Sequence, residues 1–241
     1  MGNSKNNKQR IVKYLARVGI GSRRKIEQYI IQGRISVDGQ ILKTPVCFVD
    51  EKSSILFDKK KVGLPTKTLL FKFYKPKGLV TSHSDEKGRK TVFESLPAKF
   101  PRLMSVGRLD LNSEGLLLLT NNGELARKLE LPINNWKRKY KVRAYGIIKN
   151  KDIDKLNKGI KIKNFRYKPI ETKIINNKKN NIWLEMTLTE GKNREIRKIL
   201  EFLNLNVNRL IRVSYGPILL GNLKPGKINK VDENFIKNIL D

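Results

Sequence analysis

The stretch that decides the fold is GRLDLNSEGLLLLT, residues 107–120. Residues 103–106 have the apolar character of a short strand. Residues 116–119 form an unbroken apolar run, as expected of a strand that is buried on both faces. The loop between them has a glycine at each end, which permits a tight turn or a close backbone approach. Asp110 in that loop is a place for chemistry, although a solvated, turn-forming Asp explains the spacing equally well.

The charge of the chain indicates a polyanionic partner. Its 241 residues are enough for one large domain, or for a small domain and a larger one. Lys and Arg number 52 against 22 Asp and Glu, a net charge of +30. Self-repulsion on this scale usually accompanies a nucleic acid or an anionic membrane. An apolar run of about 18 residues and a secretory signal are both lacking, so we expect a cytoplasmic protein that does not span a membrane.

Cysteine and histidine usage argues against a metal site. The single Cys47 excludes a disulfide framework within one chain, and one cysteine with one histidine makes structural zinc improbable. The histidine, His83, lies in a polar loop and has no partner in the sequence. It is therefore a poor choice for a catalytic base.

The N-terminal segment predicts a small domain. Residues 1–8 are polar and basic, and we expect a disordered arm there. Apolar residues at helical spacing over 11–18 predict a helix, which a glycine ends. Ser22 is suited to cap a second helix, and residues 38–39, Asp-Gly, predict a type I′ hairpin turn.

The second helix begins with three cations, Arg23, Arg24 and Lys25. Cations in a first turn oppose the helix macrodipole at about 0.3–1 kcal/mol each. A bound phosphate reverses that sign and uses the free backbone N–H groups, whereas solvent and salt alone could screen the charges. Residues 9–62 resemble the alpha-L RNA-binding domain first described in a small-subunit ribosomal protein. The resemblance implies that this helix lies against an RNA backbone.

The larger part predicts an α+β domain, with strands dominating. We expect a linker at 63–67, the domain itself at 68–231, and a terminal helix or frayed tail at 232–241. Alternation over 137–145 places Tyr140 on the core side of a strand, with Lys139 and Lys141 on the other face. A helix is predicted over 193–203. Short strands are predicted at Val207, 209–213, 218–220 and 79–81.

Five motifs in order resemble the ribosomal RNA pseudouridine synthases that carry an N-terminal alpha-L domain. The resemblance covers nearly the whole chain and implies a mixed, mostly antiparallel sheet. The versions at 190–198 and 209–216 are most similar to the branch that modifies large-subunit RNA. The motifs are KPKG at 75–78, GRLDLNSEGLLLLT at 107–120, RKYKV at 138–142, LTEGKNREIRK at 188–198 and RLIRVSYG at 209–216.

The resemblance implies a reaction that needs no cofactor and no metal. A uridine in RNA is cut from its sugar, rotated and rejoined through ring carbon-5. By similarity Asp110 is the nucleophile, and Arg197 is the cation that pairs with it. Tyr140 packs on the base and takes the ring proton, and Leu210 lies below the base. Attack by Asp110 on the sugar, attack on the ring, and assistance to glycal formation all fit.

The implied partner is ribosomal RNA or a pre-ribosomal particle, bound by a monomer. A uridine in a stem must be flipped into a pocket, and cations then hold the backbone. Each such cation could equally be a solvated charge. Besides Arg23, Arg24 and Lys25, the cations expected at the RNA are Arg108, Lys139, Lys141, Lys192, Arg194, Arg209 and Arg212.

Three alternatives remain at this point. The same chemistry could act on small-subunit RNA or transfer RNA. A non-catalytic RNA-binding protein of ribosome assembly would explain the charge and the first domain, but it has no need for Asp110, Tyr140 and Arg197 together. A glycoside hydrolase could use Asp110 and Glu114 as its carboxyl pair, but that function leaves the charge unexplained.

Overall fold

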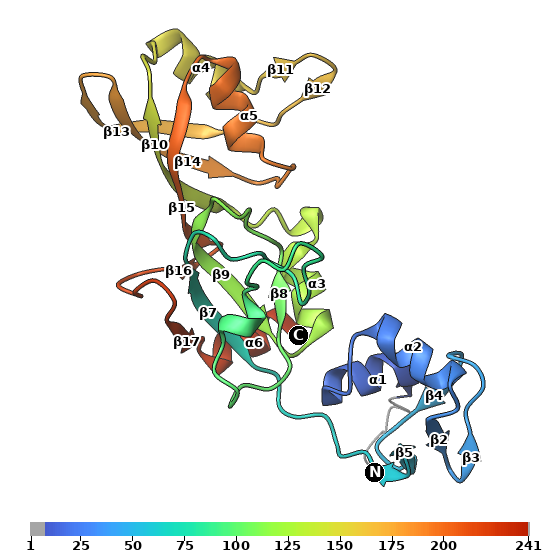
Figure 1. The fold of residues 1–241 in the computed structure, drawn as a ribbon. Coiled ribbons are helices and arrows are strands. Elements are labelled where there is room, and N and C mark those ends of the chain that lie inside the picture. Colours follow the sequence, from blue (N-terminus) through green and yellow to red (C-terminus); the bar gives the residue numbers. More distant parts are fainter. Residues whose placement is uncertain (1–7, 241) are drawn as a thin grey trace. The chain divides into compact units, whose positions relative to one another are not determined.

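The chain divides into two compact units in the computed structural model, which describes residues 8–240 (Figure 1). The first unit holds the residues up to Thr68 together with 99–102 and 121–123. The second holds the remainder of the chain. Within the described residues, the helices are all too short and too polar to cross a bilayer.

The first unit combines two helices with a four-stranded antiparallel sheet in the order β3-β2-β5-β6. A further pair, β1 with β4, contacts helix α1. The core of the unit is formed by the inward faces of α1 and α2 against the sheet. The elements are β1 (Gln9–Arg10), α1 (Ile11–Val18), α2 (Arg23–Ile31), β2 (Ile35–Val37), β3 (Gln40–Ile41), β4 (Phe48–Val49), β5 (Ile55–Phe57) and β6 (Lys60–Lys61).

The caps of these helices follow the sequence. Gly19 ends α1 with a φ of 103°, and the Ser22 hydroxyl accepts the Lys25 N–H at 3.2 Å at the start of α2. Arg23, Arg24 and Lys25 are exposed on the first turn of α2. The arm expected at 1–8 lies outside the described residues, except for Lys8, which is exposed.

The second unit is built on a nine-stranded sheet, which confirms the predicted α+β class with a mixed, mostly antiparallel sheet. The order is β13-β14-β10-β15-β9-β7-β17, with β16 beside β15 and β8 beside β9. Only β9 and β15 pair in parallel among the described strands. These strands are β7 (Leu70–Lys75), β8 (Met104–Val106), β9 (Glu114–Thr120), β10 (Arg138–Tyr145), β13 (Glu171–Lys178), β14 (Asn181–Leu188), β15 (Asn206–Tyr215), β16 (Ile218–Leu219) and β17 (Ile228–Lys230).

Helices cover the two halves of this sheet separately. Apolar residues of α4 and α5 pack on β10 and β14, and those of α3 and α6 pack on β7 and β9. All seven residues of β9 are buried, as the apolar run predicts. The helical elements are α3 (Gly123–Glu130), α4 (Asn150–Lys158), α5 (Glu195–Phe202), α6 (Glu233–Leu240) and the 3-10 turns at Phe93–Ser95 and Pro132–Asn134; a small hairpin joins β11 (Lys161–Ile162) to β12 (Phe165–Arg166).

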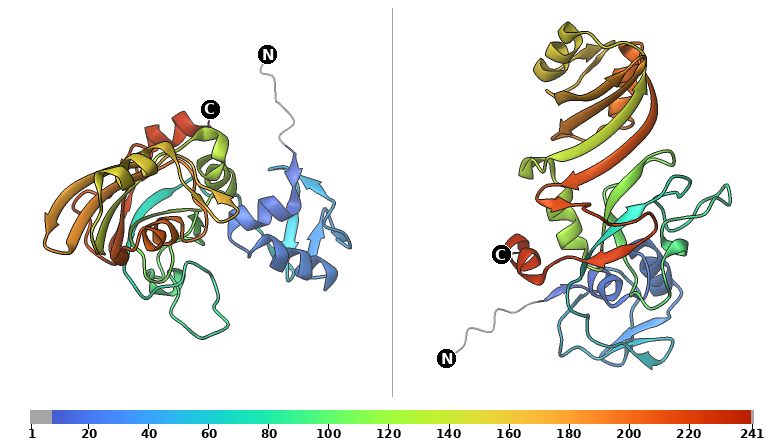
Figure 2. Two further views of the ribbon diagram at one scale, coloured as in Figure 1. Left: turned by 90° about the horizontal axis from the view of Figure 1, so that it is seen from above. Right: turned by 90° about the vertical axis from the view of Figure 1, so that its left-hand side faces the viewer.

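Three local predictions are refined by the structure. The short strands expected at Val207 and 209–213 form one continuous strand, β15. β10 pairs with this strand along its whole length, and a shift in the pairing register between Arg143 and Ala144 accommodates the extra residue Asn208. Figure 2 shows these two strands side by side along a curved path. Residues 79–81 form no strand, only an isolated bridge from Val80 to Thr91. The final residues form a helix, α6, whose Ile236 is buried.

Gly115 allows the two halves of the sheet to meet. It pairs with Arg212 across the parallel contact of β9 and β15, at a φ of +101°. A Cβ atom there would lie 2.4 Å from the Arg212 carbonyl oxygen and 2.8 Å from its nitrogen. Both atoms are backbone and cannot turn away, so only glycine fits at this position.

We predict that Gly115→Ala destabilises the protein far more than Gly78→Ala. Gly78 has a similar φ of +86°, but a Cβ added there would meet nothing within 4 Å, so it reports backbone strain alone. That strain is about 1–2 kcal/mol, and the backbone overlap at Gly115 adds about 1–3 kcal/mol. Urea unfolding of the two variants measures the difference. Equal losses would show that β15 can move away from β9 at little cost.

Candidate active site

The loop that carries Asp110 is fixed by a buried ammonium group. Lys75, at the end of β7, has no exposed surface. Its Nζ donates to the main-chain carbonyls of Ser113 at 2.8 Å, Asp110 at 3.1 Å and Leu111 at 3.4 Å. Burial lowers the Lys75 pKa to about 8, and the charges of Asp110 and Glu114 oppose that effect. One side chain therefore gathers the carbonyl groups of the whole turn.

Other hydrogen bonds fix the same loop from its flanks. Thr81 Oγ1 donates to the Leu109 carbonyl at 2.8 Å, and Glu130 accepts the Gly107 N–H at 2.6 Å. The Ser113 N–H closes the turn on the Asp110 carbonyl at 3.0 Å. Asp110 itself is half-buried, and its carboxylate accepts no hydrogen bond from any described residue. The carboxylate is thus held in place by its backbone and left free to react.

Asp110 opens into a cavity of about 370 Å³, within the range of ~300–1,000 Å³ usual for small-ligand sites. The cavity lies between the ends of β10 and β15, the Asp110 loop and the turn that precedes α5. Its walls combine apolar and cationic side chains. Besides Asp110, they include Arg108, Arg138, Tyr140, Leu188, Glu190, Lys192, Arg194, Glu195, Leu210, Arg212 and Tyr215.

Neighbouring strands place Tyr140 and Leu210 in this cavity. On β10, Tyr140 shares the inward face with Val142 and Ala144, as the alternation predicts, and packs partly against the core. On β15, Leu210 is buried and pairs with Val142 in the ladder. An aromatic ring and an aliphatic side chain therefore line the same space as Asp110.

Arg197 lies near the Asp110 loop but contacts its backbone. In place of the ion pair expected with Asp110, its guanidinium donates to the carbonyls of Asn112 at 2.8 Å and Val207 at 3.1 Å. Burial lowers the Arg197 pKa, the charge of Arg194 adds to that effect, and Asp110 opposes it. Arg197 thus links the Asp110 loop to the start of β15 and contributes positive charge to the surroundings of Asp110.

The cations expected at the RNA fall into distinct groups. Arg108, Lys192 and Arg194 are exposed and line the cavity. Lys139 and Lys141 lie on the other face of β10 from Tyr140, and Lys139 pairs with Glu185 at 2.9 Å. Neither Lys139 nor Lys141 lines the cavity, since strand alternation turns them away from it.

Arg209 and Arg212 are not the free, solvated cations that the sequence suggests, because Arg209 is exposed but ion-paired and Arg212 is buried. The Arg209 guanidinium binds both carboxylate oxygens of Glu114, at 2.7 and 3.0 Å. Arg212 is only 2% exposed, although it lines the cavity. Arg209 is therefore committed to an ion pair, and Arg212 is a buried charge.

Glu114 has a structural role, and this argues against a glycoside hydrolase that would use Asp110 and Glu114 as its carboxyl pair. Its carboxylate, which pairs with Arg209, also accepts a hydrogen bond from the Tyr74 hydroxyl at 3.0 Å. The hydrogen bond from Arg209 lowers the Glu114 pKa, despite burial, and Tyr74 adds to the effect. Glu114 does not line the Asp110 cavity. It therefore cannot serve as the neutral acid that a glycosidase needs.

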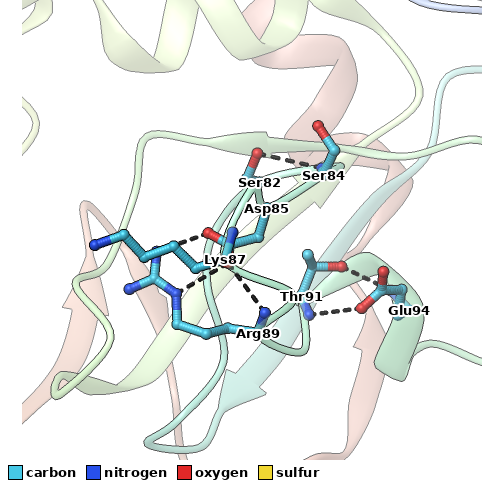
Figure 3. Close-up of polar contacts among 7 residues, drawn as sticks. All are labelled: Ser82, Ser84, Asp85, Lys87, Arg89, Thr91 and Glu94. Atoms are coloured by element: carbon cyan, nitrogen blue, oxygen red, sulfur yellow. Dashed lines mark hydrogen bonds and ion pairs between the residues drawn. The ribbon is translucent and has the colours of Figure 1, made fainter.

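The loop that contains His83 is organised by its own side chains (Figure 3). Asp85 accepts the backbone N–H groups of Lys87 and Arg89 and also binds the Arg89 guanidinium at 2.7 Å. Thr91 and Glu94 bond to one another's backbone at the base of the loop. The His83 ring stacks on Phe93 at 3.7 Å and is not part of the cavity wall.

A pair of carboxyl groups in the cavity wall was not recognised from the sequence. Glu195 is buried at the start of α5, where its Oε2 accepts the Lys192 N–H at 3.0 Å. Burial, followed by the hydrogen bond to Glu190, raises the Glu195 pKa to about 8. Glu190 in turn accepts the Lys168 N–H and pairs with the Lys192 ammonium at 3.0 Å. Glu190 and Glu195 thus hold the turn at 190–195 through backbone N–H groups, and burial favours the neutral form of Glu195.

Comparison with protein families identifies the family of the chain. The sequence profile described as RNA pseudouridylate synthase matches residues 70–202, more than half of the chain. The chain belongs to the RNA pseudouridylate synthase family. The S4 domain profile matches residues 9–51, within the first unit.

Similar proteins cover nearly the whole synthase. An uncharacterized RNA pseudouridine synthase of Rickettsia typhi is 44% identical over 235 residues, which cover 96% of this chain and 95% of the relative. The ribosomal large subunit pseudouridine synthase B of Buchnera aphidicola is 37% identical over 241 residues, 96% of each chain. A crystal structure of a pseudouridylate synthase has the same fold, with a TM-score of 0.68, 22% identity and coverage of 95% and 99%.

The geometry suits the chemistry of a pseudouridylate synthase. The reaction needs a reactive carboxylate, walls that hold a flat base, and cations at the mouth for the RNA backbone. The synthase brings Asp110, Tyr140, Leu210, Arg108 and Arg194 to the walls of one cavity. Lys75 belongs to the sequence motif KPKG, but the motif alone does not indicate that the Lys75 side chain is buried.

We predict that Lys75→Met reduces turnover at least about tenfold and lowers stability by about 1–3 kcal/mol, because the loop carbonyls lose their buried donor. RNA affinity should be unchanged, since Lys75 is inaccessible. Lys72→Met on the same strand is the matched control and should change stability by no more than about 0.5 kcal/mol. Single-turnover assays and urea unfolding test both. Normal turnover in Lys75→Met would show that the Asp110 loop holds itself.

We predict that Glu195→Gln becomes more stable relative to the wild type as the pH rises. The unfolded chain releases this proton near the ordinary pKa of 4.5, whereas the folded protein keeps it until about pH 8. The contribution of Glu195 to the free energy of unfolding of the wild type is therefore fully present below pH 4.5 and is lost as the pH rises toward 8. Urea unfolding at pH 5, 6.5 and 8.5 measures the trend. Glu201→Gln, exposed on the same helix, should give a flat difference; a flat result for Glu195→Gln as well contradicts the assignment.

Proposed function

We propose that this synthase converts one uridine of large-subunit ribosomal RNA to pseudouridine, as a cytoplasmic monomer that recognises naked RNA or an assembling particle. The observation that carries the proposal is the free carboxylate of Asp110 in the same cavity as Tyr140 and Leu210. The likeness to relatives named ribosomal large subunit pseudouridine synthase B supports the choice of RNA. No described residue forms an ion pair with the Asp110 carboxylate, so the carboxylate is available to react.

Four residues in or near the cavity have roles in this proposal. Asp110 acts as the nucleophile on the flipped nucleotide. Tyr140 packs on the base and removes the proton from carbon-5, and Leu210 supports the opposite side. Arg197 positions the loop through Asn112 and keeps positive charge near Asp110. Because all of these come from different strands and loops, a small displacement of any one would separate the reacting atoms.

The cations divide into those around the cavity and those on α2 of the first unit. Arg108, Lys192 and Arg194 at the cavity mouth would contact the phosphates beside the flipped nucleotide. Arg23, Arg24 and Lys25 on α2 would hold a separate part of the RNA, where the N-terminal N–H groups of the helix add to their charge. Because these contacts are electrostatic, they attract RNA of any sequence and set the register only together with the cavity.

We predict that Asp110→Asn lowers turnover by about 10⁴-fold, the scale of losing one member of a catalytic unit. Asn has the shape of Asp but is a poor nucleophile. Folding should be retained, since no described residue relies on the Asp110 carboxylate, and RNA binding should hold or tighten because a negative charge is removed. Tritium release from carbon-5-labelled uridine in a large-subunit RNA fragment measures turnover.

The matched control is Asp154→Asn, an exposed carboxylate on α4, which should release tritium at the wild-type rate. A melting curve and an RNA-binding isotherm accompany each variant. If Asp110 only formed a turn, Asn would replace it well and release would be nearly normal. A well-folded Asp110→Asn protein with that behaviour would exclude the proposed mechanism.

A further inference from the structure

Arg212 is a buried cation without a counter-ion. It lies on β15, opposite Tyr140 of β10, and only 2% of its surface is exposed. Its Nε donates to the Leu116 carbonyl at 2.6 Å, and its guanidinium lies 5.3 Å from the centre of the Tyr215 ring. Its Nη2 is enclosed without a hydrogen-bond partner, and no ion pair joins Arg212 to a carboxylate among the described residues. Buried charges are normally paired.

This charge belongs to the wall of the reactive cavity, which Arg212 lines with Asp110, Tyr140 and Leu210. Its position is fixed by the backbone, because Gly115 permits β9 to lie directly against the main chain of Arg212. The acidic groups of the cavity have other partners or a separate role. Glu190 pairs with Lys192, and Glu195 accepts the Lys192 N–H in a buried position that raises its pKa and favours its neutral form. The protein therefore supplies Arg212 as positive charge that its own side chains do not neutralise.

The isomerisation creates a negative charge that such a cation can stabilise. When the bond from C1′ to N1 breaks, its electron pair stays with the uracil, and the charge spreads onto the two ring carbonyl oxygens. The Asp110 carboxylate bonds to the electron-poor C1′, and this bond breaks again, returning its electron pair to Asp110, when the base reattaches. Carbon-5 then bonds to C1′, its proton leaves to a base, and N1 gains a proton, so that no atom is gained or lost. Between the two bonds the uracil must turn, and hydrogen bonds fixed in one direction cannot follow it.

We infer that Arg212 provides the fixed positive charge that stabilises the detached uracil anion while it turns. The inference rests on the pseudouridine synthase activity and deepens it. A buried charge acts at every orientation of the ring, and its effect is strengthened because the Arg212 guanidinium itself is removed from water. A contact with the RNA backbone fits Arg212 less well, since exposed cations already occupy the mouth. A purely structural role accounts for the bond to Leu116 but not for the unpartnered Nη2.

The test compares RNA fragments that carry either uridine or 5-fluorouridine at the target position. Fluorine withdraws electrons, so it stabilises the detached base and lessens the need for a protein cation. Single-turnover loss of the starting nucleoside is followed in nuclease digests by liquid chromatography, which separates the isomers, with detection by mass spectrometry. The variants are Arg212→Met, Arg212→Gln, which keeps a donor for the Leu116 carbonyl, and Arg212→Lys, which keeps a charge. Arg143→Met, exposed on β10, is the matched control.

We expect the neutral variants to process uridine about 100-fold more slowly, the scale of removing one electrostatic donor. We expect 5-fluorouridine to be affected at least tenfold less, so that the rate ratio of the two substrates rises. Arg212→Lys should give an intermediate ratio, and Arg143→Met the wild-type ratio and rate. Arg212→Lys tests the inference even if both neutral variants fail to fold, because a displaced charge must still change the ratio.

Three results would overturn the inference. A slow variant with an unchanged substrate ratio indicates a structural role. Weaker RNA binding with unchanged single-turnover rates at saturating enzyme indicates a phosphate contact. A wild-type rate in a folded neutral variant shows that the charge has no role in turnover. An inactive wild-type protein is a separate outcome, because it rejects the proposed function and not the role of Arg212 within it.

Discussion

The close approach of Gly115 to Arg212 is the constraint on which the active site depends. It is the point at which β9 and β15 pair in parallel, and thus where the two halves of the large sheet are joined. The Asp110 loop enters β9 immediately before this point, and Leu210 lies two residues before Arg212 on β15. With any larger residue than glycine, the strands would separate and the carboxylate would move away from the base-binding wall.

The buried charges of the second unit are assigned to different tasks by their partners. Lys75 is surrounded by main-chain carbonyls, so it orders a loop. Glu114 is enclosed by Arg209 and Tyr74, so it joins strands and cannot exchange a proton easily. Asp110 has no such partner. Reactivity in this site thus depends on which ionisable side chains the fold leaves without a hydrogen-bond or ion-pair partner, and less on which ionisable residues are present.

The sequence predicted the strand after Asp110, the inward side of Tyr140 and the capped helix at Ser22, because each depends on local spacing. It did not predict that Arg212 is buried or that Arg209 binds Glu114. Those outcomes depend on which strands become neighbours, and spacing along one strand contains no such information. The continuous β15 was missed for the same reason: the bulge at Asn208 is visible only once β10 is known to be the partner.

The parallel contact of β9 and β15 joins positions roughly a hundred residues apart, Glu114 and Ile211. The strand pairings of the first unit, in contrast, span shorter separations, the longest being from Gln9 to Val49, and contacts of shorter range form faster. On a translating ribosome, the first unit can therefore fold while the Asp110 loop still has no opposite wall. Only when β15 has emerged can the cavity close, so a nascent chain would gain a domain able to bind RNA well before it could alter a nucleotide.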